Sequence, residues 1–245
     1  MKKFWECKQS ANQNEADVFI FGEIVSFKWD DTDTTAASFQ KDLKELGEVS
    51  QINLHINSPG GSVFEGIAIG NMLRQHKARV VAHVDALAAS IASVIVASCD
   101  EVIMPENSML MIHNPWTISM GNAKELRKQA DDLDKIAESS VVTYLAKAGE
   151  KLTEEKIKQI MDEETWMSAQ EAYNYGLCDV VESANQVAAS ISQKLFETYQ
   201  KVPEKLLDSR QEDSRDQEKI EKIVEHTKQN LDRHNSRRII NENIV

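Results

Sequence analysis

The sequence predicts an α/β fold, because runs with the two-residue alternation of strands are followed by runs with the apolar spacing of helices. Residues 52–56 (INLHI) alternate like a strand and lead through paired glycines into a helical pattern over 67–77. Residues 79–84 (RVVAHV) form the next strand-like run, and 84–98 continue it through a turn of small residues into an apolar helix. This order is typical of parallel βαβ units with right-handed crossovers.

The length, composition and charge of the chain exclude some classes of function. The chain has 245 residues and a hydrophobic content of 41%, which is enough for a sizeable core. The formal net charge of -12 argues against a nucleic-acid partner. No apolar run reaches the roughly 18 residues that a membrane-spanning helix needs, and no apolar segment follows the basic N-terminus as in a secretory signal. We therefore expect neither a nucleic-acid partner nor a membrane.

The cysteines predict a cytoplasmic protein without a metal site. Cys7, Cys99 and Cys178 lie far apart in the sequence and lack the spacing of metal ligands. An odd number of unpaired thiols fits a reducing cytoplasm. Cys99 and Cys178 stand in apolar surroundings, so we expect them to be small core residues.

The other elements follow in order along the chain. Residues 18–24 (VFIFGEI) alternate like a first strand, after a short polar segment over 1–17. Residues 32–46 have the spacing of an amphipathic helix that begins near Thr32 or Asp33. Further downstream we expect a strand over 108–116, a long helix over 121–149, short helices over 152–161 and 168–177, and a closing strand over 178–181.

The C-terminal part, residues 184–245, changes character. Residues 185–199 have apolar spacing that predicts one more helix, and 201–245 are dense in charge and poor in aromatic side chains. The repeat of Ile220, Val224, Thr227 and Leu231, at intervals of four, three and four, suits a short coiled-coil seam but covers few heptads. Two interpretations of residues 201–245 therefore stand: a partly disordered tail, or a helix that contacts other subunits. We expect a polar segment over 1–17, a main domain over 18–183 and a helical or partly disordered extension over 184–245.

Ser90 stands at the predicted junction between a strand and a helix. Its neighbours Ala88, Ala89 and Ala92 are small, so they leave its hydroxyl accessible. The free N–H groups at the start of a helix point outward at the same place. This is a geometry that suits a nucleophile. The alternative explanation of these small residues is structural, because they also allow a helix to pack closely against a sheet.

His113 and a pair of glycines offer the other groups that nucleophilic catalysis needs. His113 ends an apolar strand-like run and is followed by Asn114 and Pro115, where the chain leaves the core, so it is a candidate general base. Gly60 and Gly61 can take positive φ and open a helix, where exposed N–H groups bind negative charge. An oxyanion hole and an ordinary glycine turn are both compatible with this spacing.

Four motifs in order resemble the proteolytic subunit of the Clp protease (ClpP), a self-compartmentalising serine peptidase. They are INSPGG at 56–61, AAS with a following apolar residue at 88–91, MIHNP at 111–115 and WMSAQEAYNYGLCD at 166–179. Their order and spacing are similar to those of the family from about residue 19 to about residue 182. The chain resembles in particular the ClpP-related proteases of phage and prophage head-assembly regions.

The resemblance implies a Ser-His-acid triad. Ser90 matches the nucleophile and His113 the general base of the family. The third member should come just before Trp166, and Glu164 aligns with the position where ClpP usually has aspartate. Asp162 is the alternative acid, with Glu163 beside it.

By the same resemblance, the turn of Gly60 and Gly61 forms the oxyanion hole, and the donors are the N–H groups of Gly61 and Ile91. This chemistry needs no metal and no organic cofactor. ATP would act only through a separate unfoldase, because the chain has no GxxxxGK[ST] phosphate-binding motif.

The resemblance also implies a fold and an assembly. Repeated ββα units would wind into the spiral of ClpP-like and crotonase-like proteins. The helix over 121–149 matches the handle through which heptameric rings stack, so we expect a homo-oligomer that encloses polypeptide substrates in a chamber. The region before residue 18 is shorter than in ClpP, which argues against a docked unfoldase.

The substrates that the resemblance implies are phage capsid or scaffold proteins. Three alternatives are a general ClpP that works with an ATP-dependent unfoldase, a non-catalytic assembly protein, and a crotonase-like acyl-CoA enzyme.

Overall fold

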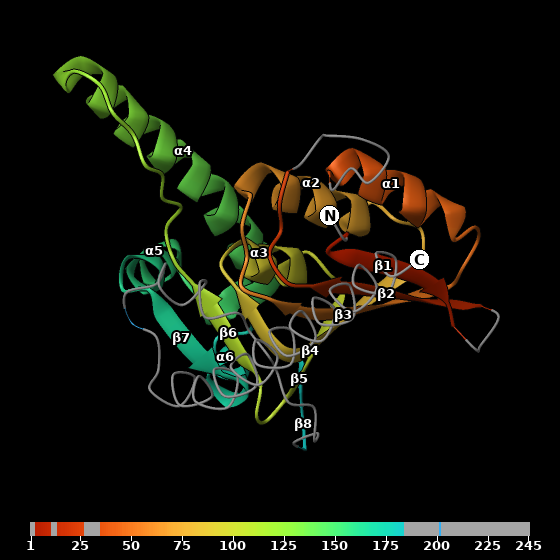
Figure 1. Cartoon of the computed structure of the whole chain (residues 1–245). Helices are drawn as coiled ribbons and strands as arrows, with labels where there is room; N and C mark the ends of the chain where they lie inside the picture. Colours follow the sequence, from red (N-terminus) through yellow and green to blue (C-terminus); the bar gives the residue numbers. More distant parts are fainter. Residues whose placement is uncertain (1–2, 11–13, 27–34, 184–200, 202–245) are drawn as a thin grey trace, which may run out of the picture. The chain divides into compact units, whose positions relative to one another are not determined.

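The computed structural model describes residues 3–10, 14–26, 35–183 and 201 (Figure 1). The strands are β1 (Trp5–Gln9), β2 (Glu15–Phe21), β3 (Gln51–Ser58), β4 (Arg79–Ala89), β5 (Glu101–Pro105), β6 (Met109–Ile112), β7 (Thr165–Ser168) and β8 (Val180–Glu182). The helices are α1 (Ala36–Glu45), α2 (Val63–Arg74), α3 (Ile91–Ala97), α4 (Ala123–Ala148), α5 (Glu154–Asp162) and α6 (Ala169–Asn174), with a 3-10 turn over Gly149–Lys151.

The strands form one mixed sheet, and the predicted α/β fold is confirmed. The strand order is β1-β2-β3-β4-β5-β8. Strands β2, β3, β4, β5 and β8 are parallel to their neighbours, whereas β1 is antiparallel to β2. Parallel neighbours need crossover connections, which α1 supplies between β2 and β3 and α2 supplies between β3 and β4.

Strand β4 divides the sheet into two branches. Its first half, at 81–83, pairs with β5, and its last residues, at 87–89, pair in parallel with β6. Strand β6 in turn pairs antiparallel with β7. The C-terminal ends of β4 and β6 therefore lie side by side, which is the place where α/β sheets present their reactive groups.

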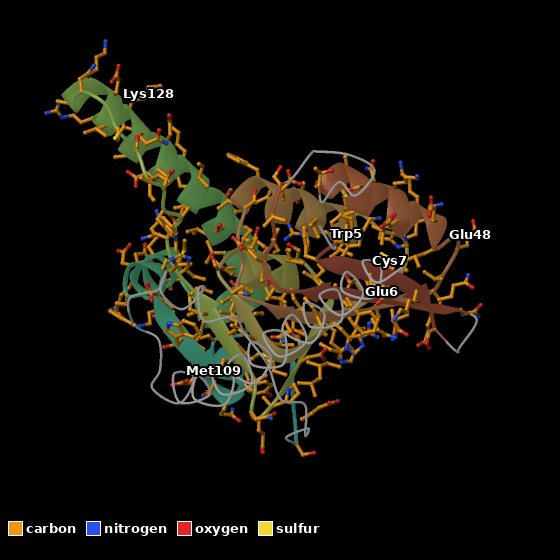
Figure 2. All side chains as sticks on the ribbon, viewed as in Figure 1. Trp5, Glu6, Cys7, Glu48, Met109 and Lys128 are labelled. Atoms are coloured by element: carbon orange, nitrogen blue, oxygen red, sulfur yellow. The ribbon has the colours of Figure 1, made fainter. Side chains whose placement is uncertain are left out.

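The main core lies between the sheet and its helices. Figure 1 shows α1 and α2 beside each other along one face of the strands. Strand residues such as Ile20 and Ile56 are fully buried on that face, and Phe39 of α1 packs edge-on against Trp5. The Trp5 indole also donates a hydrogen bond of 2.8 Å to Asp42 of α1, and Figure 2 shows Trp5 next to this helix.

The other face of the sheet carries a stack of rings that is separate from Ser90 and His113. Phe19, His55 and His83 stand on adjacent strands with ring centroids about 5 Å apart, at 4.9 and 5.0 Å. The hydrogen bond that the His55 ring donates to the Asp85 carboxylate raises the pKa of His55, whereas burial and the neighbouring His55 lower the pKa of His83. Both histidines are partly buried in this stack.

Helix α4 projects away from the rest of the described residues (Figure 1). Its C-terminal half packs on the core through Val141 and Tyr144, while its N-terminal half is exposed, with Lys128 near its far end (Figure 2). Asn122 caps the helix by accepting from the N–H groups of residues 124 and 125. Helices long and apolar enough to span a membrane are absent from the described part of the chain.

Several predicted boundaries are wrong. Helix α1 is capped by Thr35 and not by Thr32 or Asp33, because the Thr35 hydroxyl accepts from the Ser38 N–H in a capping box. Helix α2 begins at Val63 and ends at Arg74, before the predicted end at residue 77. Strand β4 continues to Ala89, five residues past the predicted end, because small buried residues suit a strand as well as a turn.

Strands β1, β5 and β7, which are four or five residues long, were not predicted. Cys99 and Cys178 are buried as predicted. The predicted helix over 185–199 and the seam over 220–231 lie outside the described residues.

Candidate active site

Ser90 and His113 stand at the ends of two paired strands. Ser90 follows the last residue of β4 and His113 follows the last residue of β6. The pairing of Ala89 with Met111 keeps the two strands in register, and the Ser90 N–H donates to the Met111 carbonyl at 2.9 Å. As a result Ser90 Oγ lies 2.8 Å from His113 Nε2, a hydrogen-bond distance.

The backbone at Ser90 is strained. Its φ of 56° and ψ of -130° lie outside the regions that ordinary residues occupy. In the part of the chain that the structure describes, Ser90 and Glu164 are the two non-glycine residues with positive φ. Such strain costs of order 1–3 kcal/mol per residue and is found mainly at functional sites. Two of the three residues expected in the triad therefore stand out by geometry alone.

His113 has the protonation that a general base needs. Burial lowers the pKa of His113, and the charge of Glu164 opposes this by raising it. Because burial dominates, the imidazole is neutral at neutral pH. A neutral Nε2 can accept the hydroxyl proton of Ser90.

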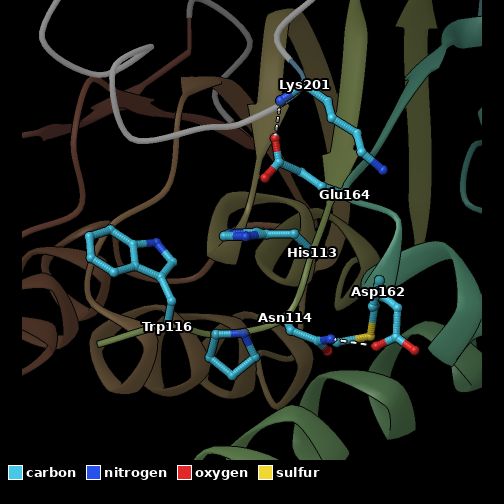
Figure 3. A pocket seen from close by; sticks show the side chains of 8 residues that line it. His113, Asn114, Trp116, Asp162, Glu164 and Lys201 are labelled. Carbon is cyan, nitrogen blue, oxygen red and sulfur yellow. Dashed lines mark hydrogen bonds between the residues drawn. The ribbon is translucent and has the colours of Figure 1, made fainter. Parts of the chain in front are cut away.

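The register of β6 and β7 places Glu164 beside His113. Ile112 pairs with Thr165 at the end of this antiparallel ladder, so the next pair outward is His113 with Glu164. Glu164 also follows the last turn of α5 in the left-handed conformation, with φ of 49°, at a position that glycine usually occupies. In Figure 3 the Glu164 carboxylate lies next to the His113 ring.

Asp162, the alternative acid, has a different partner. Its carboxylate accepts a hydrogen bond of 2.6 Å from the Asn114 side chain (Figure 3). This contact joins the end of α5 to the residue after His113. Asp162 therefore supports the loop of the histidine, and the structure brings Glu164, not Asp162, into electrostatic contact with the ring.

Lys201 contacts the Glu164 carboxylate, and the sequence analysis did not predict this contact. Its backbone N–H donates to Glu164 Oε1 at 2.9 Å, and its ammonium group donates to the Glu163 carbonyl at 2.5 Å. Nothing in the local sequence signals this contact, because the two residues are 37 positions apart.

An open pocket of about 450 Å³ lies beside these groups (Figure 3). Its lining includes His113, Glu164 and Lys201 together with Trp116 and Met161. Charged and apolar side chains therefore meet in its lining.

The glycine turn lies against the other side of Ser90. A Cβ atom on Gly60 would lie 2.6 Å from Ser90 Cβ, and a side chain on Gly61 would collide with the Ile24 carbonyl. The Gly60 N–H donates to Ser58 Oγ at 3.2 Å, so this amide is occupied. Within the described residues, the N–H groups of Gly61 and Ile91 have no acceptor.

The site has no arrangement suited to a metal among the described residues, where no three His, Cys, Asp or Glu side chains come together. The thiols are also unsuited to nucleophilic attack. Burial raises the pKa of Cys99 to about 12 and that of Cys178 to about 11.

An α/β fold that brings a serine into contact with a neutral histidine beside free N–H groups is typical of serine hydrolases. A family model described as Clp protease matches residues 9–185, which is most of the chain. The chain belongs to the Clp protease family and is a serine peptidase of the ClpP type.

Individual relatives agree with the family match. The chain is 30% identical over 183 residues to an ATP-dependent Clp protease proteolytic subunit of Bacteroides fragilis, covering 71% of this chain and 87% of the relative. It is 36% identical over 142 residues to the protein of the same name from Pleurastrum terricola, covering 57% of this chain and 71% of the relative. A third relative of this name, from Chlorella vulgaris, is 34% identical over 131 residues, 52% of this chain and 64% of the relative.

The contact between Gly60 and Ser90 generates a prediction. Gly60→Ala places a methyl group 2.6 Å from Ser90 Cβ and 2.8 Å from the Ala89 carbonyl oxygen, so Ser90 must move. We expect labelling of Ser90 by a fluorophosphonate to slow on the order of 10²-fold, as for a displacement of about 1 Å in a catalytic group. The measurement is the labelling rate with circular dichroism on the same sample.

Gly47→Ala is the matched control. Gly47 also has positive φ, at 74°, but has open space around it and lies far from the site in sequence. It should lose stability with an unchanged labelling rate. Equal labelling rates for Gly60→Ala and the unaltered chain would contradict the proposed role of this glycine.

Proposed function

We propose that this chain cleaves peptide bonds through an acyl-enzyme, with Ser90 as the nucleophile, His113 as the general base and Glu164 as the acid of the triad. The observation that carries the proposal is the 2.8 Å contact between Ser90 Oγ and His113 Nε2 at a strained turn. Ser90 Oγ attacks the substrate carbonyl while its proton passes to Nε2. His113 then gives this proton to the leaving amine, and water releases the acyl group by the same route in reverse.

Glu164 has the role of orienting His113. With Nε2 facing Ser90, the other ring nitrogen carries the proton, and a carboxylate on that side stabilises the imidazolium that forms during attack. The antiparallel register of β6 and β7 supports this assignment over Asp162, which holds Asn114 instead.

The oxyanion is stabilised by the N–H groups of Gly61 and Ile91. Both donors lack an acceptor among the described residues, so they are free to bind a developing negative charge. Gly60 is not a donor to the oxyanion, because its N–H donates to Ser58 Oγ. Its role is steric, because a side chain at this position would collide with Ser90.

Family membership indicates an oligomeric protease that acts on polypeptides. We propose that a heptameric ring or a stacked double ring forms around a chamber, with α4 as the contact element. The projecting half of this helix supports the proposal, because it lies away from the core and leaves its side chains accessible to other chains. The free cysteines support a reducing cytoplasm as the location.

The proposed substrates are phage capsid or scaffold proteins. This rests on the resemblance to proteases of head-assembly regions. The alternative is a general ClpP that works with an unfoldase, which the name of the relatives, ATP-dependent Clp protease proteolytic subunit, favours. Processing of co-expressed head proteins without an unfoldase would favour the role in head assembly. Cleavage of peptides that leaves head proteins intact would favour a general ClpP.

The activated serine can be tested by labelling. A fluorophosphonate should modify Ser90 in the unaltered chain, because the hydroxyl is deprotonated by His113 as it attacks phosphorus. His113→Ala should slow this reaction by at least about 10³-fold, as removal of a triad member does elsewhere. Mass spectrometry maps the modified residue.

His55→Ala serves as the control, since it removes a histidine from the stack on the other face of the sheet. Its labelling rate should match that of the unaltered chain. Labelling of a different residue, or labelling that survives in His113→Ala, would overturn the assignment. A folded, assembled protein that is not labelled would favour the non-catalytic assembly protein.

Glu164→Gln should lower kcat/KM by about 10²- to 10⁴-fold, because the imidazolium loses its counter-charge and the ring its correct tautomer. The pH profile supplies a second readout. Glu164 raises the pKa of His113, so its neutralisation lowers that pKa further. The acidic limb of kcat/KM, which reports the loss of neutral His113 as pH falls, should therefore move to lower pH.

Asp162→Asn is the matched control and should reduce activity far less without moving the acidic limb. Glu164→Gly should also be nearly inactive yet at least as stable to heat as the unaltered chain, because glycine relieves the positive φ at this position. A larger loss for Asp162→Asn than for Glu164→Gln would identify Asp162 as the acid.

A further inference from the structure

A pair of buried hydroxyl groups lies directly behind Ser90. Ser93 stands one turn later in α3 and Tyr144 stands in the buried half of α4. Ser93 Oγ donates to the Ser90 carbonyl at 2.5 Å and lies 2.7 Å from the Tyr144 hydroxyl oxygen. Exposed fractions of 1% for Ser93 and 2% for Tyr144 exclude water from this contact.

The direction of these hydrogen bonds follows from the number of protons. Ser93 has a single hydroxyl proton, and the Ser90 carbonyl accepts it. The Tyr144 hydroxyl must therefore donate to Ser93 Oγ. The Ser93 N–H also donates to the Ser90 carbonyl, at 3.0 Å. A chain of donors thus runs from Tyr144 through Ser93 to the Ser90 carbonyl, which receives two hydrogen bonds.

The Ser90 carbonyl belongs to the same peptide unit as the Ile91 N–H. Hydrogen bonds accepted by a peptide oxygen polarise the whole unit and make its N–H a stronger donor, an effect of about 10–30% per bond in a buried chain. They also hold the plane of the peptide, and with it the direction of the N–H. Ile91 is one of the two proposed oxyanion donors, so both effects act where negative charge develops.

The hydroxyl pair is not needed to fill the core. Ser93 is the single polar side chain in α3, whose sequence is IASVIVA and whose residues are all buried. Alanine and phenylalanine would occupy nearly the same volume without any polar atom to satisfy, and such an exchange of both partners is often neutral for stability. Packing alone therefore does not require these two hydroxyls.

We propose that Ser93 and Tyr144 are positioning residues that orient and polarise the peptide between Ser90 and Ile91 for oxyanion binding. The proposal rests on the proposed function of Ser90 and Ile91. It also ties the oxyanion hole to α4, since the first donor of the chain belongs to that helix.

Tyr144→Phe tests the proposal with the least change, because the ring stays and one hydroxyl is lost. We expect kcat for a peptide substrate to fall about 3- to 10-fold with KM unchanged, which is smaller than the 10²- to 10³-fold cost of deleting a direct oxyanion donor. A peptide boronate, which forms a tetrahedral adduct with serine hydroxyls, should bind more weakly by the same factor. Tyr173→Phe, at an exposed tyrosine of α6, is the matched control and should change neither value.

Ser93→Ala removes both links at once but leaves the Tyr144 hydroxyl buried without a partner, so this variant loses stability as well. The double variant Ser93→Ala with Tyr144→Phe removes both hydroxyls and keeps the packing. If the two act in one chain, the double variant loses no more kcat than Ser93→Ala alone. Ser98→Ala, at the other end of α3, controls for loss of a buried hydroxyl.

The outcomes separate this proposal from the proposed function. Unaltered kcat and boronate affinity in both Tyr144→Phe and the folded double variant would overturn it, while Ser90 labelling that depends on His113 would still hold. A rise in KM alone, or a loss of kcat without loss of boronate affinity, would also overturn it. Matched losses of kcat and boronate affinity, with Tyr173→Phe and Ser98→Ala unchanged, would support it.

Discussion

The parallel pairing of β4 with β6 is the constraint on which the site depends. It brings the ends of two strands together, and the bond from the Ser90 N–H to the Met111 carbonyl fixes their offset. Ser90 and His113 then meet at 2.8 Å although they are 23 positions apart in the sequence. The second pairing of β6, with β7, adds Glu164 beside the histidine. One short, buried strand thus orders all three side chains.

Strain at the site is balanced by burial around it. Ser90 and Glu164 have positive φ, a backbone conformation that residues other than glycine rarely adopt. Every residue of α3 is buried behind Ser90, and α5 holds the turn before Glu164 with Ile157, Ile160 and Met161 in the core. The packing of these two helices therefore keeps in place two conformations that would be unfavourable in isolation. The same packing buries the hydroxyls of Ser93 and Tyr144 next to the Ser90 carbonyl.

The order of the main strands and helices was predicted from sequence, because hydrophobic periodicity reports local structure. Ser90 could be singled out because it stands at a predicted strand–helix junction among small residues, and His113 because it ends an apolar run. The residues alone left Glu164 and Asp162 open as the acid, because three acids stand in a row. The register of β7 and the Asn114–Asp162 hydrogen bond, which favour Glu164, depend on tertiary structure. The Lys201 contact and the link from Tyr144 to Ser93 join distant positions that no local pattern marks.

Detection of an acyl group on Ser90 during turnover of a peptide or ester substrate tests the central claim most directly. The reaction is quenched with acid within the first turnover, and the modified residue is located by mass spectrometry. We predict a substrate-derived acyl group on Ser90 that appears before the second product and is absent in His113→Ala. Turnover by the folded protein with no adduct, or with an adduct on another residue, would contradict the proposed mechanism.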